Sequence, residues 1–387
     1  MNGCFPIAAV QYSQINFSFR HIAGIWYNDV RARKLRPYQS IDTMYLSKEQ
    51  RIAAGTGNIG IIIDEAGADR FGEPEVMDNK LERPEIATIL AKYFSDKDFD
   101  YSRIDSGSSN STYRVDLNGQ SYVLSIFESN DSGHVAELTS ILKQLEECGI
   151  KSSRVVPTLD GRLHSTFNDK PTLLKEFIAG EELTHATVTV SVASDIGGEL
   201  ARLHGSGEFE TRRDTQHYGY EVFEGIAAEL PGGNFKNWYL DEYNRLFADF
   251  PSNLPMGFVH SDVFPGNVII ENGQFKCLLD FEYLSYYPLV FDLACGIVGL
   301  TWQNGSLKAN LSRSLISGYE AERQLAKEEY EALPYFCRYI ALFFAGWRYR
   351  QFNITFPNPE RAQDYLEMKD VFEAFTSQIS GIGGYVE

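Results

Sequence analysis

The sequence predicts an α+β fold of two lobes, a small mixed β-sheet followed by a mainly helical region. Residues 113–124 alternate apolar and polar side chains around Asn118-Gly119, a dipeptide typical of a type I′ β-hairpin. Residues 135–148 and 192–204 instead carry apolar side chains at helical spacing. Because the hairpin pattern precedes the longer helical run, we expect the sheet first and most of the helices after it.

The first part of the chain has a different character from the rest. Residues 1–76 show no sustained helical or strand period apart from 59–63, and the regular pattern begins at Met77. We expect either an N-terminal extension of unknown role over 1–76 or a misassigned start. A G-x-G-x-x-G match at 55–60 precedes a strand-like segment, whereas a dinucleotide site needs it after a strand and before a helix. We interpret this match as chance.

The remaining chain divides into an N-terminal lobe over residues 77–178 and a C-terminal lobe over 179–387. Strands over 162–165 and 171–177 are expected to complete the sheet, and Ile178-Ala179-Gly180 to leave it as a hinge between the lobes. Glu199 and His204, in the helix that follows, are expected to be surface or capping residues.

Composition narrows the class of protein. The 387 residues are 43% apolar and carry a net charge of −18, which argues against nucleic-acid binding. No stretch approaches the roughly 20 apolar residues that a membrane helix needs, so no membrane association is expected. The five cysteines are scattered without a C-x-x-C pair, as is typical of reduced thiols in a cytoplasmic protein.

The segment from Gly257 to Glu282 is the most informative part of the chain. It contains His260-x-Asp262-x4-Asn267 in an expected loop, then a short apolar strand, then Asp280 beside Phe281. Phosphoryl transfer needs a carboxylate for the acceptor proton, and an amide oxygen and a second carboxylate for metal ions. The spacing matches that of a kinase catalytic loop and its metal-binding Asp. The sequence therefore predicts a phosphotransferase.

A second candidate site lies upstream of this motif. The small polar loop Ser106-Gly107-Ser108-Ser109-Asn110-Ser111 precedes the expected hairpin. Such a loop lets backbone N–H groups approach phosphates closely, although Gly/Ser turns are also common without a ligand.

Together these motifs resemble those of the aminoglycoside phosphotransferase-like kinases over residues 77–350, and within them most closely those of the bacterial homoserine kinases. The segments that carry the closer resemblance are Gly107 to Tyr113, the Phe264-Pro265 of the catalytic loop, and residues 315–338. The resemblance implies a protein-kinase-like two-lobed fold and a small-molecule kinase that uses ATP and Mg²⁺. Its acceptor would be the hydroxyl of homoserine or another amino alcohol.

The resemblance also assigns roles to single residues. Asp262 would be catalytic, with His260 beside it as a buttress of the loop, and Asn267 and Asp280 would hold metal. Asp292 would cap a helix and bind the loop backbone, whereas Glu282 would face the acceptor or a second metal, or be a solvated acid. The nucleotide would contact these residues: Ser106, Gly107, Ser108, Ser109, Asn110, Ser125, Glu176 and Ile178.

The chain departs from the kinase pattern at one position. Kinases of this fold usually place a Lys after Val-Leu on the third strand, where it holds the α- and β-phosphates, but Val123-Leu124 is followed here by Ser125. Homoserine kinases of this type often have Thr at this place. Metal, loop amides or an Arg such as Arg114 would have to compensate, and the role of Glu137, the usual partner of that Lys, is open. Without compensation the chain would be a catalytically silent kinase fold.

The acceptor site is the least specified. The carboxylate of homoserine would need a cation, and Arg338, Arg348 and Arg350 are the candidates, although packing with snorkelling stems is the commoner role of such residues. An aminoglycoside or sugar kinase is the alternative, with an acid-lined cleft. The acids that could line it fall on a highly charged helix and are better explained as a solvated face: Glu320, Glu322, Glu328, Glu329 and Glu331.

Overall fold

The computed structural model describes residues 80–96, 98–104, 110–128, 132–209 and 219–377. The predicted extension, its G-x-G-x-x-G match and loop residues 106–109 lie outside these ranges. The chain divides into two compact units with the boundary between Ile86 and Ala87, inside α3 (Arg83–Leu90). The strands, the helices after α3 and the candidate site all belong to the unit that continues from Ala87.

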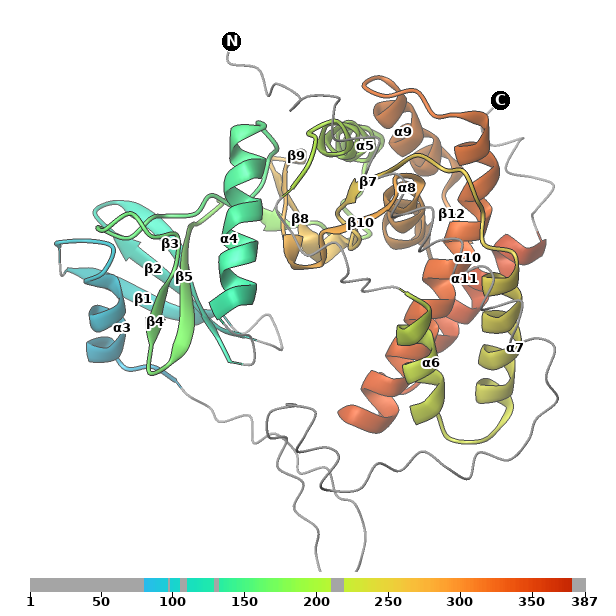
Figure 1. Ribbon diagram of the computed structural model, residues 1–387, viewed down its shortest axis with the longest axis horizontal. Helices are drawn as coiled ribbons and strands as arrows, with labels where there is room; N and C mark the ends of the chain where they lie inside the picture. The colour runs from blue at the N-terminus through green and yellow to red at the C-terminus, as the bar shows by residue number, and fades with distance from the viewer. Residues whose placement is uncertain (1–79, 97, 105–109, 129–131, 210–218, 378–387) are drawn as a thin grey trace, which may run out of the picture. The chain divides into compact units, whose positions relative to one another are not determined.

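A five-stranded sheet forms the N-terminal lobe, with the strand order β1-β2-β3-β5-β4 (Figure 1). Its strands are β1 (Phe99–Ile104), β2 (Asn110–Leu117), β3 (Gln120–Phe127), β4 (Ser165–Phe167) and β5 (Lys170–Glu176). All its pairings are antiparallel rather than mixed, because hairpins join most neighbours and β5 enters beside β3 from the β4–β5 hairpin. The strand predicted over 162–165 is wrong in position: only Ser165 of that segment belongs to β4.

The hairpin between β2 and β3 has the predicted turn. Asn118 and Gly119 both have positive φ, 54° and 75°, as a type I′ turn requires. This turn sets the register in which Tyr113 faces Leu124 and Thr112 faces Ser125.

Helix α4 (Ser132–Glu147) confirms the helix predicted over 135–148 and covers one face of the sheet. Its buried Val135, Leu138 and Leu142 share one hydrophobic core cluster with Phe127 of β3 and Leu173 of β5. Side chains alternate between the two faces of a strand, so this cluster identifies the face of β3 and β5 that α4 covers.

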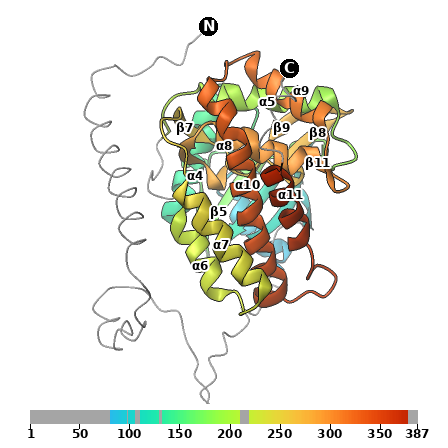
Figure 2. The same ribbon diagram turned by 90° about the vertical axis from the view of Figure 1, so that its right-hand side faces the viewer.

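Helices dominate the rest of the chain (Figures 1 and 2). They are α5 (Val190–His204), α6 (Tyr220–Glu229), α7 (Asn234–Ala248), α8 (Val290–Gly296), α9 (Ala309–Glu320), α10 (Lys327–Arg350) and α11 (Tyr365–Ser377). Two π-helical segments, Ile297–Thr301 and Gln351–Thr355, continue α8 and α10. Figure 2 shows α10 beside α11, and α10 also contacts α6, α7 and α8, so it is the central helix of this lobe.

Short strands interrupt the helices and carry the loops that matter below. They are β6 (Glu181–Glu182), β7 (Met256–Val259), β8 (Val268–Glu271), β9 (Gln274–Leu278), β10 (Ser285–Pro288), β11 (Trp302–Gln303) and β12 (Ser306–Leu307). The strand β7 pairs with β10, and β8 pairs with β6 and β9. The single-turn helices η1 (Pro265–Asn267) and η2 (Phe281–Tyr283) lie before β8 and after β9.

Helices α5 and α9 pack in close contact through glycines. A Cβ atom on Gly318 would lie 1.9 Å from the Ser194 carbonyl oxygen, and one on Gly197 would lie 2.0 Å from that of Leu315. Small residues here let the two backbones touch. The helix predicted over 192–204 is confirmed as α5, which begins after Thr189, whose hydroxyl accepts a hydrogen bond from the Val192 N–H. None of the helices in the described part of the chain is long and apolar enough to cross a membrane.

Candidate active site

The two predicted motifs lie side by side because a hairpin connects them. The chain leaves β7 at Val259, passes through residues 260–264 and η1, and returns through β8 and β9 to Asp280. The Leu279 N–H donates to the Asn267 carbonyl, 2.8 Å away, which ties the residue before Asp280 to the end of the loop. The local β-structure thereby brings Asp262, Asn267 and Asp280 to one place.

His260 is fully buried and both of its ring nitrogens bind backbone atoms. Nε2 donates to the Leu279 carbonyl at 2.8 Å, and Nδ1 accepts from the Asp262 N–H at 3.2 Å. The ring also packs against Phe281, with 4.6 Å between centroids. Neither nitrogen is left for proton transfer in this arrangement, so His260 holds the loop of Asp262 to the strand end before Asp280.

Asp262 and Asn267 are directly bonded. The Asn267 Nδ2 donates to the Asp262 carboxylate at 2.7 Å and to its backbone carbonyl at 2.9 Å. This fixes the Asp262 side chain and leaves the Asn267 Oδ1 without a partner among the described residues. Burial raises the pKa of Asp262 to about 6; His260 opposes this rise and Asp280 adds to it.

Asp280 is exposed and has the left-handed backbone conformation, with φ at 60°. Its carboxylate accepts no hydrogen bond from any residue in the described ranges. Glu282 lies half-buried two residues later, where burial, followed by the charge of Asp280, raises its pKa to about 7, and Lys175 opposes the rise. Asp262, Asp280 and Glu282 therefore concentrate negative charge in one region.

These residues suit Mg²⁺. The ion prefers carboxylate and amide oxygens, keeps several of its waters and takes further ligands from phosphates. Asp280 and the free Asn267 Oδ1 supply two such oxygens, and an ion between the acids would relieve their mutual repulsion. No three His, Cys, Asp or Glu side chains of the described residues form a group that could hold a metal ion by themselves.

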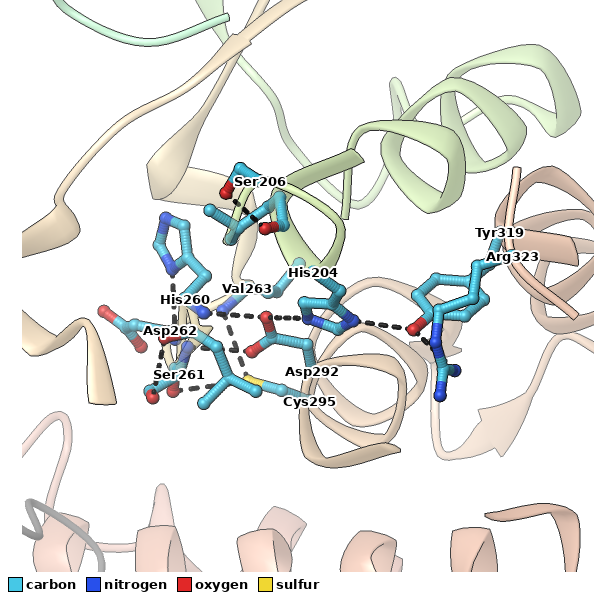
Figure 3. A network of polar contacts seen from close by, with 12 residues as sticks. His204, Ser206, His260, Ser261, Asp262, Val263, Asp292, Cys295, Tyr319 and Arg323 are labelled. Carbon is cyan, nitrogen blue, oxygen red and sulfur yellow. Dashed lines mark hydrogen bonds and ion pairs between the residues drawn. The ribbon is translucent and has the colours of Figure 1, made fainter. Parts of the chain in front are cut away.

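Helix α8 holds the backbone of the catalytic loop through Asp292 (Figure 3). The Asp292 carboxylate, fully buried, accepts from the N–H groups of His260 at 2.7 Å and Ser261 at 2.8 Å. One turn later, the Cys295 sulfur accepts from the Val263 N–H. Ser261 has a positive φ of 73°, a conformation that these bonds to α8 support. The role predicted for Asp292 at the loop backbone agrees with these contacts, whereas the predicted helix cap is wrong, because Asp292 lies inside α8 and its carboxylate binds the loop instead.

Asp292 is the end of a buried polar chain that reaches three more helices (Figure 3). His204 of α5 donates from Nε2 to Asp292 at 3.0 Å and accepts at Nδ1 from the Tyr319 hydroxyl of α9 at 2.7 Å. Arg323 donates to that hydroxyl and pairs through two bonds with Glu329 of α10, at 2.9 and 3.0 Å. Because Arg323 can only donate and the Asp292 carboxylate accepts, each hydrogen bond between Arg323 and Asp292 is donated toward Asp292.

Three expectations are wrong at this point. Glu199 and His204 are not surface or capping residues: Glu199 is fully buried and accepts from the Lys151 N–H and from Arg202, each at 2.6 Å. Glu329 is not part of a solvated face, because it is buried against Arg323. The signal that sequence reasoning lacked is pairing over long separations, since His204 and Asp292 are 88 residues apart.

Four of the predicted nucleotide residues belong to the described ranges, and they lie on the sheet and at its exit. Asn110 begins β2 with a buried Oδ1 that has no hydrogen-bond partner among the residues the structure describes, and Ser125 is buried on β3 between Thr112 and Leu173. Glu176, exposed, ends β5, and Ile178 follows it half-buried.

Arg114, proposed as a substitute for the missing Lys, is engaged elsewhere. It donates to Asp116 and Ser121, each at 3.1 Å, and its guanidinium lies over the Phe177 ring.

Comparison with known proteins agrees with this geometry. Residues 100–325 match the family model described as the phosphotransferase enzyme family, which is more than half of the chain. The chain belongs to this family. It is also 29% identical over 269 residues to a homoserine kinase of Sinorhizobium fredii, covering 67% of this chain and 82% of that protein. The predicted resemblance and the predicted enzyme class, a small-molecule kinase, are confirmed.

Solved structures of other kinases share the fold of this phosphotransferase. The amicoumacin kinase hAmiN in complex with AMP-PNP, Ca²⁺ and Ami has a TM-score of 0.63 at 16% identity, covering 76% of this chain and 93% of that one. The microcompartment-associated aminopropanol kinase has a TM-score of 0.55 at 17% identity, covering 78% and 99%. These likenesses confirm the predicted α+β, protein-kinase-like fold.

The three candidate acceptor-binding arginines of this phosphotransferase differ in their surroundings. Arg348 donates to Glu367 at 2.7 Å and to the Asp364 carbonyl, and Arg350 lies 3.5 Å from Glu229. Arg338 has a buried Nε without a partner and forms no ion pair with any described residue. The acids of the C-terminal lobe are partly used as well, since Glu322 pairs with Arg202 and Glu331 with Lys327.

Proposed function

We propose that the protein is an ATP- and Mg²⁺-dependent kinase that phosphorylates the hydroxyl of a small amino alcohol, with homoserine as the leading substrate, in the cytoplasm. The observation that supports this most directly is the grouping of Asp262, Asn267 and Asp280 by one hairpin, with Asp262 fixed by the Asn267 amide. These groups match the requirements of phosphoryl transfer, which depends on positioning and on charge neutralisation rather than on covalent chemistry by the protein.

Each residue has a part in the transfer. Asp262 orients the acceptor hydroxyl and takes its proton as the hydroxyl oxygen attacks the γ-phosphorus and the bond to the leaving ADP oxygen breaks. Asn267 and Asp280 would hold Mg²⁺, which supplies positive charge against the phosphate oxygens. His260 and Asp292 keep the loop in place through its backbone.

Homoserine leads because curated relatives such as the one from Sinorhizobium fredii are homoserine kinases. Its carboxylate requires a cation, and Arg338 is the one of the three candidates without an ion pair in the described chain. An aminoglycoside is disfavoured because the predicted acidic face is partly occupied by internal ion pairs. A silent kinase fold is the other alternative, and the lack of a Lys at Ser125 is its support.

The test is acceptor-dependent ADP release by the full chain with Mg-ATP. The acceptors are homoserine, choline-like amino alcohols, simple sugars and kanamycin. Asp262→Asn serves as the blank, and Asp160→Asn, which changes an exposed acid paired with Arg162, serves as the matched control. Turnover with homoserine that only Asp262→Asn abolishes supports the proposal. Turnover with another acceptor alone replaces homoserine, and no turnover with any acceptor favours the silent fold.

A further inference from the structure

Ser125 stands where kinases of this fold usually carry a Lys, so a different cation is needed to meet the phosphates of the nucleotide. A nucleotide with three phosphates carries several negative charges, and kinases of this kind meet them with a cation on the sheet as well as with metal. Arg114 does not fill this place, since Asp116, Ser121 and the Phe177 ring engage it. The register of the neighbouring strand shows where another cation lies.

Strand β5 places Lys175 next to the position that lacks the Lys. In the antiparallel β3–β5 pair, Ser125 faces Leu173 and Val123 faces Lys175. Residues directly opposite one another share a face, so Lys175 projects from the same face as Ser125 as its diagonal neighbour, about 7–8 Å away between backbones. The flexible four-carbon stem of lysine lets its ammonium cover such an offset.

This face is the one that α4 covers and that leads to the metal-binding residues. Leu173 and Phe127, which share it, pack into the core cluster of α4. Helix α4 in turn contacts η2, which holds Glu282. The charge of Lys175 acts on Glu282, two residues after Asp280. Strand register therefore places Lys175 on the face that α4 covers, α4 contacts the η2 helix that holds Glu282, and the charge of Lys175 acts on Glu282.

The Lys175 ammonium has no ion-pair partner in the described part of the chain. It is half-buried, and within the described residues its ammonium forms no ion pair or hydrogen bond, whereas Lys170 on the same strand pairs with Glu128. A cation that forms no ion pair among the described residues, and whose charge acts on Glu282, suits an anionic ligand that brings its own metal.

We propose that Lys175 of β5 replaces the missing third-strand Lys and binds the phosphates of the nucleotide. This inference rests on the proposed function, because it requires that the site accepts ATP. It assigns a phosphate-binding role to a strand position just before the expected hinge, where Glu176 and Ile178 are predicted contacts of the nucleotide. The kinase therefore keeps a cation on the sheet but supplies it from the neighbouring strand.

Calorimetric binding of ATP, ADP and adenosine with Mg²⁺ to the full chain tests this role without relying on turnover. Lys175→Met keeps the length of the side chain and removes its charge, Lys175→Arg keeps the charge, and Lys170→Met is the matched control on β5. We expect Lys175→Met to weaken ATP and ADP binding by about 10- to 100-fold, the range for a charged hydrogen bond, and to leave adenosine binding unchanged. Lys175→Arg should restore most of the loss, and Lys170→Met should bind like the unmodified protein.

Each other outcome has a definite meaning. If the unmodified protein binds no ATP, the proposed function fails. If it binds ATP and Lys175→Met binds equally well, or loses adenosine to the same extent, the role of Lys175 is overturned while the proposed function stands. A labelling experiment on the unmodified protein covers the case of a variant that does not fold. An acyl phosphate of ATP transfers its acyl group to an amine near the phosphates and releases ATP. Peptide mass spectrometry should find the resulting amide on Lys175. If the amide is absent from Lys175 and another lysine is labelled in a way that excess ATP suppresses, the proposal is overturned.

Discussion

At the residue scale, His260 shows how a catalytic loop can depend on a side chain that performs no chemistry. Its two nitrogens join the Asp262 N–H to the Leu279 carbonyl, so it sets the spacing between Asp262, the proposed proton acceptor, and Asp280, the proposed metal ligand. We expect His260→Phe, which keeps the ring packing on Phe281, to lower kcat by about 10- to 100-fold, because small misplacements of reacting groups cost this much.

The same variant should change the KM for ATP little, since the hydrogen bonds and ring contact of His260 in the described chain go to Asp262, Leu279, Asp292 and Phe281. His164→Phe, just before β4 in the N-terminal lobe, is the matched control and should keep full kcat. Steady-state kinetics with the acceptor identified above checks both. An undiminished kcat in His260→Phe would show that the loop is held well enough by Asp292 alone.

Asp292 has the larger role in stability. Its removal would leave the buried N–H groups of His260 and Ser261 and the Nε2 of His204 without their acceptor. We expect Asp292→Ala to lower the free energy of unfolding by about 3–5 kcal/mol, as for other buried pairs that lose one member. Urea unfolding measures this. Asp364→Ala, which removes only a surface pair with Arg361, should stay within about 1 kcal/mol of the unmodified protein; an equal effect of the two changes would contradict the role given to Asp292.

At the scale of elements, the contact of α5 with α9 positions His204 beside Tyr319. The Cβ of an alanine at Gly318 would meet the Ser194 carbonyl oxygen at 1.9 Å, so the helices would have to separate. We expect Gly318→Ala to cost at least about 2–3 kcal/mol of unfolding free energy, as overpacked cores do. The matched control is Gly225→Ala in α6, where nothing lies within 4 Å of the new Cβ. Removing a helical glycine there should stabilise the protein by about 0.5–1 kcal/mol, and thermal unfolding that moved both variants in the same direction would contradict this account.

The elements also show which parts of the fold could be predicted from the sequence. The β2–β3 hairpin depends on Asn118-Gly119, and α4 and α5 depend on their own apolar spacing, so local patterns were sufficient. Strand β4 has three residues and is defined by its pairing with β5, which gives no periodic signal of its own.

The residues of the candidate site likewise differ in whether a local sequence pattern predicts them. Asp262, Asn267 and Asp280 lie within one short segment and were predictable from spacing and chemistry. His204, Tyr319 and Glu329 were not, because their charge and hydrogen-bond partners come from other helices. Lys175 belongs to the same class, since its relation to Ser125 follows from strand register rather than from any motif.

At the scale of the whole molecule, two kinds of charge arrangement coexist. The chain from Asp292 to Glu329 is internally matched and joins the catalytic loop to α5, α9 and α10. The acids Asp262, Asp280 and Glu282 form no ion pair within the described ranges, and Asp280 raises the pKa of both of the others. The first arrangement stabilises the fold, whereas the second favours binding of a cation at the expense of the unliganded protein.

This contrast predicts opposite effects of one substitution on stability and on binding. Asp280→Asn removes a charge that repels Asp262 and Glu282, so the variant should unfold at a slightly higher temperature than the unmodified protein when no ligand is present. With ATP and Mg²⁺ at 100 times the dissociation constant, the unmodified protein should gain about 2.7 kcal/mol by mass action. EDTA should remove most of that gain in the unmodified protein and almost none in Asp280→Asn, because the variant has lost the carboxylate that holds the metal. The control is Asp160→Asn, which changes an exposed acid far from this motif in sequence.

Thermal unfolding of the three proteins in buffer, in ATP with Mg²⁺ and in ATP with EDTA measures these effects. Asp160→Asn should behave like the unmodified protein in all three conditions. A gain in Asp280→Asn that EDTA removes to the same extent as in the unmodified protein would place the metal on other residues, and a lower melting temperature of the unliganded variant would show that Asp280 supports the fold rather than straining it.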